Sequence, residues 1–269
     1  MKKITCVLAA AALALALAGC SKSAPGGKNG GGTALTTEGR PPALEGKYAG
    51  YGEGAAPYEC EAVIAKRGDV YHVQWYFGGK PGYDGVGILK NGLFCVGFAD
   101  WAGRYAVAVY EVEADGTLAG VLTGAATRGR IGGTENLTPK KGILGALGGK
   151  KGGGNPGPAT EPWAIMPVGA LAGEYVGAGF SPDLSSYLCD VGLTLGQDVA
   201  VYNVAWTFDG RPGYEGAGIL MGKTFVAGFA DQQGYGVVAY TVNADGSLDG
   251  TRTGKGATRA GTEKLRKGK

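Results

Sequence analysis

The chain has 269 residues, with 26 lysines and arginines against 23 aspartates and glutamates. Two of the lysines, Lys2 and Lys3, lie in a segment expected to be removed, so the mature chain is close to neutral and lacks the clustered basic surface that a nucleic-acid partner needs. The 54 glycines follow no Gly-X-Y period, which excludes a collagen-like triple helix.

The N-terminus carries an export signal. After the basic start, an apolar run ends at Leu17 and is too short to cross a bilayer, which takes ~20 apolar residues. Leu17-Ala18-Gly19-Cys20 resembles the lipobox of bacterial lipoprotein precursors. The resemblance implies a signal peptide over residues 1–19 and a lipid-modified Cys20. Several acyl chains hold a protein to a lipid bilayer almost permanently.

The residues after the lipobox indicate the destination. In the lipoprotein pattern, an aspartate after the cysteine favours the inner membrane; here that residue is Ser21. The resemblance therefore implies a lipid-anchored protein of the outer membrane, on its periplasmic side or at the cell surface. An ordinary secretory signal with an incidental cysteine is the alternative. Residues 20–44 are rich in Ser, Gly, Lys and Pro without an apolar period and predict a flexible tether.

The rest of the chain contains one domain twice. Residues 45–138 and 172–266 are similar in sequence, and a Gly/Lys/Pro-rich linker over residues 139–171 separates them. Each copy is long enough for one modest core. The matching stretches are Gly46–Gly50 with Gly173–Gly177, Gly79–Leu89 with Gly210–Leu220, Phe94–Asp100 with Phe225–Asp231, Ala114–Leu118 with Ala244–Leu248, and Gly133–Glu135 with Gly261–Glu263.

Period and turn signals predict strands. Residues 70–77 alternate, with Trp75 on the apolar face, and Trp206 takes the same place in the second copy, so that face is predicted to be buried. Lys80-Pro81-Gly82 suits a type II turn, and Asn91-Gly92 is a type I′ hairpin signal. No window of useful length shows a helical period.

The fold class that follows is all-β. Each copy has about eight short strands joined by short connections, so neighbours in sequence are expected to pair. Eight such strands can close into an up-and-down barrel of the lipocalin type, which leaves no exposed edge. A two-sheet sandwich is the alternative, and short strands with a polar linker disfavour a single transmembrane barrel. Gly85 and Gly87 share a strand face with Tyr83, which favours a filled interior with rings over glycines rather than an open lumen.

Residues shared by both copies are the candidates for ligand or partner contacts. We expect Tyr110 and Tyr240 on the outer face, where tyrosine suits surface contacts. Asp100 and Asp231 end a strand, where aspartate commonly begins a loop. The candidates are Trp75 and Trp206, Tyr83 and Tyr214, Tyr110 and Tyr240, and Asp100 and Asp231.

Nothing in the sequence indicates catalysis, a metal or a cofactor. The single histidine, His72, has Asn203 as its counterpart in the other copy, whereas a general base or metal ligand should recur in both. Phosphate-binding loops and nucleophile elbows are absent from the sequence. Cys60, Cys95 and Cys189 would remain in an oxidising compartment; we predict small buried thiols, with a Cys60–Cys95 disulfide as the alternative.

The repeat resembles a group of exported bacterial proteins often labelled "fibronectin-binding protein". The resemblance rests on the opening Gly-x-Tyr-x-Gly, the Trp-containing strand, Gly-Tyr-x-Gly-x-Gly-Ile-Leu, Ala-Asp-Gly-[ST]-Leu and the closing Gly-Thr-Glu of both copies. The family label implies adhesion. The tether, the lipid anchor and the duplication favour a non-catalytic binding or adhesion module, for which an extracellular-matrix or cell-envelope partner is the expectation. Two linked copies would raise avidity. The alternative is a carrier of a small apolar ligand in each barrel lumen, and an enzyme is the third hypothesis.

Overall fold

The structure is a computed structural model that describes residues 43–99, 102–140, 169–231 and 234–268. Cys20, the predicted tether up to residue 42, and most of the predicted linker lie outside the described residues. Within these ranges, no helix is long and apolar enough to cross a membrane.

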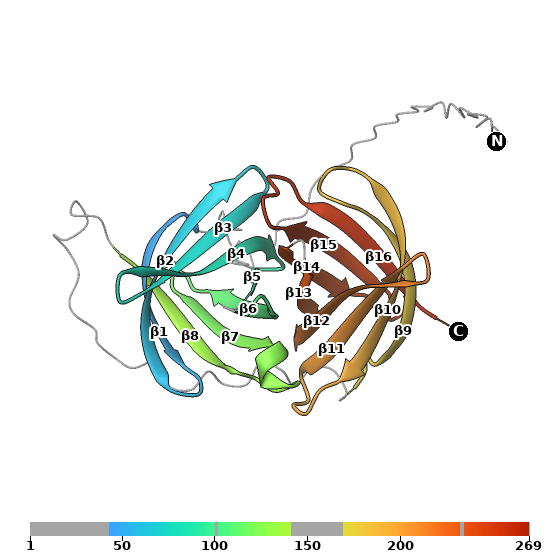
Figure 1. Cartoon of the computed structure of the whole chain (residues 1–269), viewed down its shortest axis with the longest axis horizontal. Coiled ribbons are helices and arrows are strands. Elements are labelled where there is room, and N and C mark those ends of the chain that lie inside the picture. The colour runs from blue at the N-terminus through green and yellow to red at the C-terminus, as the bar shows by residue number, and fades with distance from the viewer. Residues whose placement is uncertain (1–42, 100–101, 141–168, 232–233, 269) are drawn as a thin grey trace, which may run out of the picture. The chain divides into compact units, whose positions relative to one another are not determined.

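The first repeat forms a closed antiparallel barrel, here called barrel 1 (Figure 1). Each strand pairs with the next along the chain, and the last pairs with the first. The strands are β1 (Gly46–Glu53), β2 (Pro57–Arg67), β3 (Val70–Phe77), β4 (Lys80–Lys90), β5 (Leu93–Ala99), β6 (Tyr105–Val112), β7 (Leu118–Gly124) and β8 (Gly133–Pro139), with a 3-10 turn, η1 (Ala125–Thr127), after β7.

The second repeat forms barrel 2 with the same pairing order. Both copies are eight-stranded up-and-down barrels, which confirms the predicted fold class and excludes the sandwich. The strands are β9 (Gly173–Phe180), β10 (Ser186–Leu195), β11 (Val201–Phe208), β12 (Arg211–Met221), β13 (Thr224–Asp231), β14 (Gly234–Val242), β15 (Leu248–Gly254) and β16 (Gly261–Lys267).

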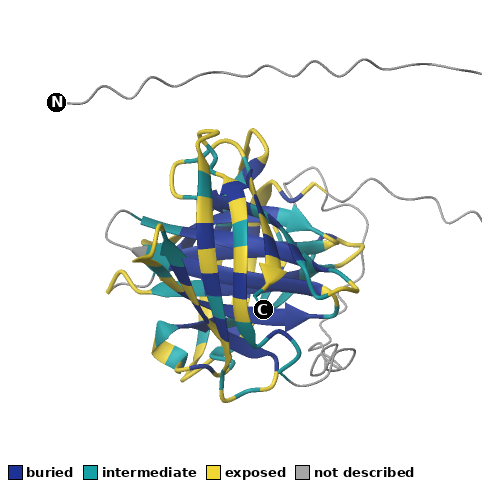
Figure 2. Ribbon diagram, turned by 90° about the vertical axis from the view of Figure 1, so that its right-hand side faces the viewer, coloured by how far each residue is buried: buried dark blue, intermediate teal, exposed yellow. Residues whose placement is uncertain are grey.

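Side-chain alternation builds each barrel interior. Successive residues point to opposite faces of a strand, and exposed and buried residues alternate along the strands of barrel 2 that face the viewer in Figure 2. Trp75 and Trp206 point inward and are buried, as predicted. Glycines make room for these rings: a methyl group on Gly85 would lie 2.8 Å from the Trp75 ring, and one on Gly216 would lie 2.8 Å from Trp206.

The predicted turn at Lys80-Pro81-Gly82 is wrong, because these residues begin β4. The chain reverses just before them, at Gly78-Gly79, where φ is +57° and +77°. In barrel 2, Asp209 and Gly210 take the same place, with φ of +49° and +72°. Positive φ at both central residues is the type I′ pattern, whose twist matches that of the flanking strands. The type I′ turn predicted at Asn91-Gly92 has the expected φ values, +52° and +80°.

The two barrels pack against each other through equivalent strands within one compact unit. The shared cluster holds Val107 and Val109 of β6 and Val237 and Ala239 of β14. The packing is close enough that a side chain on Gly97 of β5 would overlap the Gly236 carbonyl of β14. Because the same surface of each copy is used, the contact has the self-complementary form of a two-fold interface.

The expectation that Tyr110 and Tyr240 lie on the outer face is wrong. Both side chains are buried inside their barrels. The other face of β6, with Val107 and Val109, is buried as well, because it packs on barrel 2. When both faces of a strand are apolar, a period of two cannot say which one points to the lumen.

Cys60, Cys95 and Cys189, the cysteines of the described residues, are buried free thiols, as predicted. Cys60 and Cys189 lie inside barrels 1 and 2, whereas Cys95 belongs to the cluster between the barrels. Burial raises the pKa of all three thiols, that of Cys189 to about 12, so each stays protonated and weakly nucleophilic.

Candidate functional site

A buried glutamate organises the polar centre of barrel 1. Glu135 on β8 is 2 % exposed and points into the lumen. One of its oxygens accepts hydrogen bonds from the Tyr110 hydroxyl (2.5 Å) and the Trp75 Nε1–H (3.1 Å). The other accepts from the Tyr58 hydroxyl (3.0 Å), with the Cys60 thiol at 3.6 Å. Four donors thus surround one carboxylate, which is how a buried polar group is retained.

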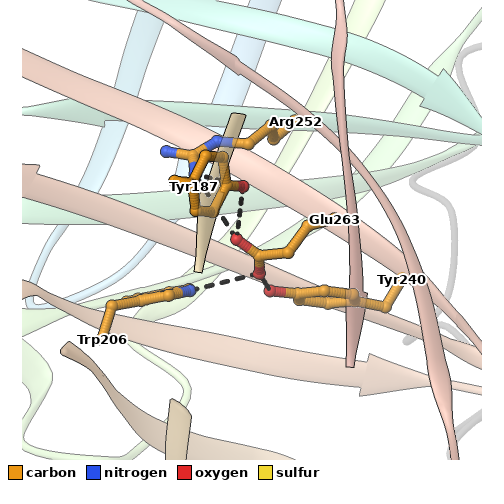
Figure 3. A network of polar contacts seen from close by, with 5 residues as sticks. All are labelled: Tyr187, Trp206, Tyr240, Arg252 and Glu263. Atoms are coloured by element: carbon orange, nitrogen blue, oxygen red, sulfur yellow. Dashed lines mark hydrogen bonds and ion pairs between the residues drawn. The ribbon is translucent and has the colours of Figure 1, made fainter. Parts of the chain in front are cut away.

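Glu263 on β16 repeats this arrangement in barrel 2 and adds a cation (Figure 3). Its oxygens accept from Tyr240, from Trp206 Nε1–H (3.3 Å) and from Tyr187 (2.7 Å). Arg252 of β15 lies 3.4 Å from the carboxylate and donates to the Tyr187 hydroxyl at 2.7 Å. The guanidinium and the carboxylate are both buried, so they form a desolvated ion pair rather than a surface salt bridge.

The tyrosines of both centres are held as hydrogen-bond donors. Burial first, and the Glu135 carboxylate second, raise the pKa of Tyr58 and of Tyr110. Burial and Glu263 likewise raise the pKa of Tyr187 and Tyr240. Burial by itself lowers the pKa of Arg252, but the neighbouring Tyr187 and Glu263 raise it by more. The net effect is a raised pKa, so the guanidinium keeps its charge.

An aromatic wall lies beside each carboxylate. In barrel 1, Phe77 contacts Tyr58 and Tyr83 edge-on, with ring centroids 5.9 and 5.5 Å apart, and Tyr83 lies 5.5 Å from Phe98. In barrel 2 the equivalent rings keep this arrangement. The Phe208 centroid lies 5.6 Å from that of Tyr187 and 5.4 Å from that of Tyr214, and Tyr214 lies 4.7 Å from Phe229.

The two barrels differ at their open ends. A cavity of about 350 Å³ enters barrel 1 and reaches Glu135, with Trp75, Tyr58 and Leu122 of β7 in its wall. Arg252 stands in barrel 2 where Leu122 stands in barrel 1. Arg252 lines a depression of about 490 Å³ at this end of barrel 2. Glu263, Trp206 and Tyr187 are not among the residues that line this depression. The cavity of barrel 1 therefore reaches its carboxylate, whereas barrel 2 covers its own with the Arg252 side chain.

Of the residues predicted to contact a ligand or partner, the aromatic ones lie in this site, whereas the side chains of the two aspartates are not described. The interior holds both tryptophans and all four tyrosines; Trp75 and Tyr83 line the barrel 1 cavity, and Tyr214 lines the barrel 2 depression. Asp231 is the last residue of β13, and its side chain is not among those described. Asp100 and Cys20 lie outside the described residues. Their predicted roles stay predictions.

Both copies share Glu135 and Glu263, but neither glutamate was predicted as a site residue, and the Leu122/Arg252 difference was missed. A signal for the glutamates exists in the closing Gly-Thr-Glu of both copies. Glu135 lies two residues before the apolar Leu137, and Glu263 lies two residues before Leu265, so each glutamate shares a strand face with a leucine. That alternation places a carboxylate on the inward face of a strand, where an acid needs partners.

We expect the raised pKa values to make the protein less stable in alkali. A group whose folded pKa lies above its unfolded value adds stability below the unfolded pKa, and this is lost as pH rises. Cys189 has an ordinary value of 9.0 and a folded pKa of about 12, and Tyr235 shifts from 10.0 to about 12. The urea midpoint should therefore fall steadily above about pH 9. Cys189→Ala should flatten that slope, and a midpoint constant up to about pH 10.5 would contradict the shifts.

Comparisons with known proteins give no family. No family model and no curated protein matches the sequence, so the resemblance to "fibronectin-binding" proteins stays a prediction. Among the described residues, no group of three or more His, Cys, Asp or Glu side chains could hold a metal ion.

Solved structures with similar architecture are distant. A protein of unknown function from the DUF3598 family of Nostoc punctiforme has a TM-score of 0.30 and 9 % identity, over 83 % of this chain and 96 % of that one. A candidate outer membrane protein from Bacteroides fragilis has a TM-score of 0.26 and 12 % identity, over 84 % and 98 %. The Myxococcus xanthus hemagglutinin, solved with a mannopentaose, has a TM-score of 0.19 and 12 % identity, over 82 % of this chain and 100 % of that one. At these scores the likeness carries no argument about function.

Proposed function

We propose that this protein is a non-catalytic binding protein that holds one small molecule in the open end of barrel 1. The observation that carries the proposal is the cavity of about 350 Å³, which lies within the size range of small-molecule sites. Aromatic rings make up much of its wall, and at its base lies one buried carboxylate that accepts hydrogen bonds from two tyrosine hydroxyls, an indole N–H and a thiol. Mostly apolar walls with a few placed polar groups are typical of ligand pockets.

Barrel 2 serves in this proposal as a structural partner. Arg252 covers Glu263, so the depression at this end does not reach the carboxylate, and the outer surface of the barrel packs on barrel 1. One ligand per chain is therefore proposed, in place of one per lumen. Avidity from two equal binding surfaces needs two equal copies. The open ends are unequal, so we favour a lumen site over adhesion to a matrix or cell-envelope partner.

The proposed location of the binding protein is the outer membrane, with the chain held by acyl groups on Cys20. The support for it is the lipobox-like Leu17–Cys20 sequence after a short apolar run. A lipid anchor would keep the binding site close to the membrane surface.

The test is a thermal-shift screen of the full-length chain in detergent against small cationic, neutral and anionic compounds. A ligand that binds only the native state raises the melting temperature saturably. Leu122→Trp should abolish the shift, because the indole fills the cavity, and Leu122→Met should keep it, because it conserves volume. Circular dichroism verifies the fold of both variants. A panel in which no compound shifts wild type more than Leu122→Trp would overturn the proposal.

A further inference from the structure

We propose that the ligand of barrel 1 carries a guanidinium group, which takes the place that the Arg252 side chain occupies in barrel 2. This inference rests on the proposed function, since it names the chemical class of the molecule bound in the same cavity. It is argued from the internal duplication: one copy shows a complete site with its cation in place, and the other copy shows the same site without one.

Barrel 2 shows what the site holds. The Arg252 guanidinium carbon lies 5.0 Å from the centroid of Tyr187, 5.2 Å from Phe229 and 5.8 Å from Tyr214, all within cation–π range. One guanidinium nitrogen contacts both the Tyr187 hydroxyl and the Glu263 carboxylate. Three rings, a hydroxyl and a carboxylate thus bind one planar cation.

Barrel 1 keeps every one of these partners. The residues that correspond to Tyr187, Tyr214, Phe229 and Glu263 are Tyr58, Tyr83, Phe98 and Glu135. The Tyr58 hydroxyl meets Glu135 at 3.0 Å, as Tyr187 meets Glu263 at 2.7 Å. All four residues line the barrel 1 cavity. What the first copy lacks is the cation itself, because Leu122 replaces the arginine.

The charge of the cavity agrees with this assignment. Glu135 and Glu53 are the charged residues in its wall, and both are acidic. Among the described residues, no lysine or arginine forms an ion pair with Glu135. The depression of barrel 2 contrasts with it, since Arg252, Lys255 and Arg259 line it beside a single acid, Asp183. An anion would be repelled from the barrel 1 cavity, and a purely apolar molecule would leave the carboxylate without a countercharge.

Hydrogen bonding narrows the class from any cation to guanidinium. The planar fork presents several N–H donors at fixed angles and stacks on aromatic faces, whereas an ammonium is a compact, strongly hydrated charge. The cavity offers both kinds of partner, with Glu135 and Tyr58 as acceptors and Tyr83 and Phe98 as faces. At about 350 Å³ it also has room for a short aliphatic body beyond the guanidinium.

Isothermal titration calorimetry on the full-length protein, with n-propylguanidinium as the probe, tests the inference. The neutral isostere n-propylurea has nearly the same shape and should bind at least a hundredfold more weakly. Propylammonium should fall between the two. Glu135→Gln should weaken propylguanidinium binding at least tenfold, while the exposed Glu59→Gln on the same barrel should leave it unchanged.

Leu122→Arg gives a second, independent variant. The new side chain should occupy the cavity as Arg252 does, so the heat of binding should vanish while the protein becomes more stable. Equal affinity for the guanidinium and the urea, or guanidinium binding that survives Leu122→Arg, would overturn the inference. If an uncharged compound binds and Leu122→Trp blocks it, the lumen site stands and only the ligand class is wrong. If no compound is blocked by either variant, both proposals fall.

Discussion

Replacing Arg252 by leucine should lower the free energy of unfolding by about 3 kcal/mol, the loss expected when one partner of a buried ion pair is removed. Glu263, which is 1 % exposed, would be left in the interior without its cation. The rings of Tyr187, Tyr214 and Phe229 would also lose the flat group that packs over them. The change is measured as the shift of the urea midpoint.

Two comparisons make this result specific. Arg211→Leu, at the exposed start of β12, should change the stability by no more than about 0.5 kcal/mol. Millimolar propylguanidinium should raise the midpoint of Arg252→Leu, because a free guanidinium can refill the vacated space and binds only the folded state. An Arg252→Leu protein as stable as wild type would show that Glu263 needs no cation and would remove the basis for assigning one to barrel 1.

Replacing Glu135 by leucine should cost on the order of 4 kcal/mol, because it removes the acceptor of several buried donors at once and each unsatisfied donor costs ~1–3 kcal/mol. The Tyr58 and Tyr110 hydroxyls and the Trp75 N–H all donate to this carboxylate. Glu135→Gln keeps one acceptor oxygen and should cost less. Denaturant unfolding monitored by tryptophan fluorescence measures both variants.

The control for this prediction is already present in the second copy. Glu59→Leu puts into β2 the residue that barrel 2 carries at the equivalent place, Leu188, which is 67 % exposed. The stability of that variant should stay within about 0.5 kcal/mol of wild type. A loss for Glu135→Leu no greater than for Glu59→Leu would mean that the glutamate does not organise the lumen.

The barrels were predictable because local signals agree with the global fold. The duplication, the period of two around Trp75 and the type I′ signal at Asn91-Gly92 all favour a meander of short strands. The error at Lys80-Pro81-Gly82 has a local cause, since Gly78-Gly79 supplies the positive φ values that a two-residue hairpin needs. Proline then fits inside β4, where a register shift interrupts the pairing with β3.

The site was less predictable for two physical reasons. Tyr110 was placed outside because the packing between barrels makes both faces of β6 apolar, and no single-strand pattern records that contact. The second reason concerns which residues carry information. A search for residues common to both copies finds the aromatic wall and the glutamates, yet the decisive position is unshared, Leu122 against Arg252. Its meaning depends on the fold, in which β7 pairs with β8, the strand of Glu135, and Leu122 lines the same cavity as that glutamate.

The most direct measurement is the number of propylguanidinium ions retained per chain in native mass spectrometry of three full-length proteins. The structure predicts one ligand for wild type, none for Leu122→Arg, and two for Arg252→Leu, in which both lumens would be open. The same count in all three proteins would contradict a ligand site in the lumen of barrel 1.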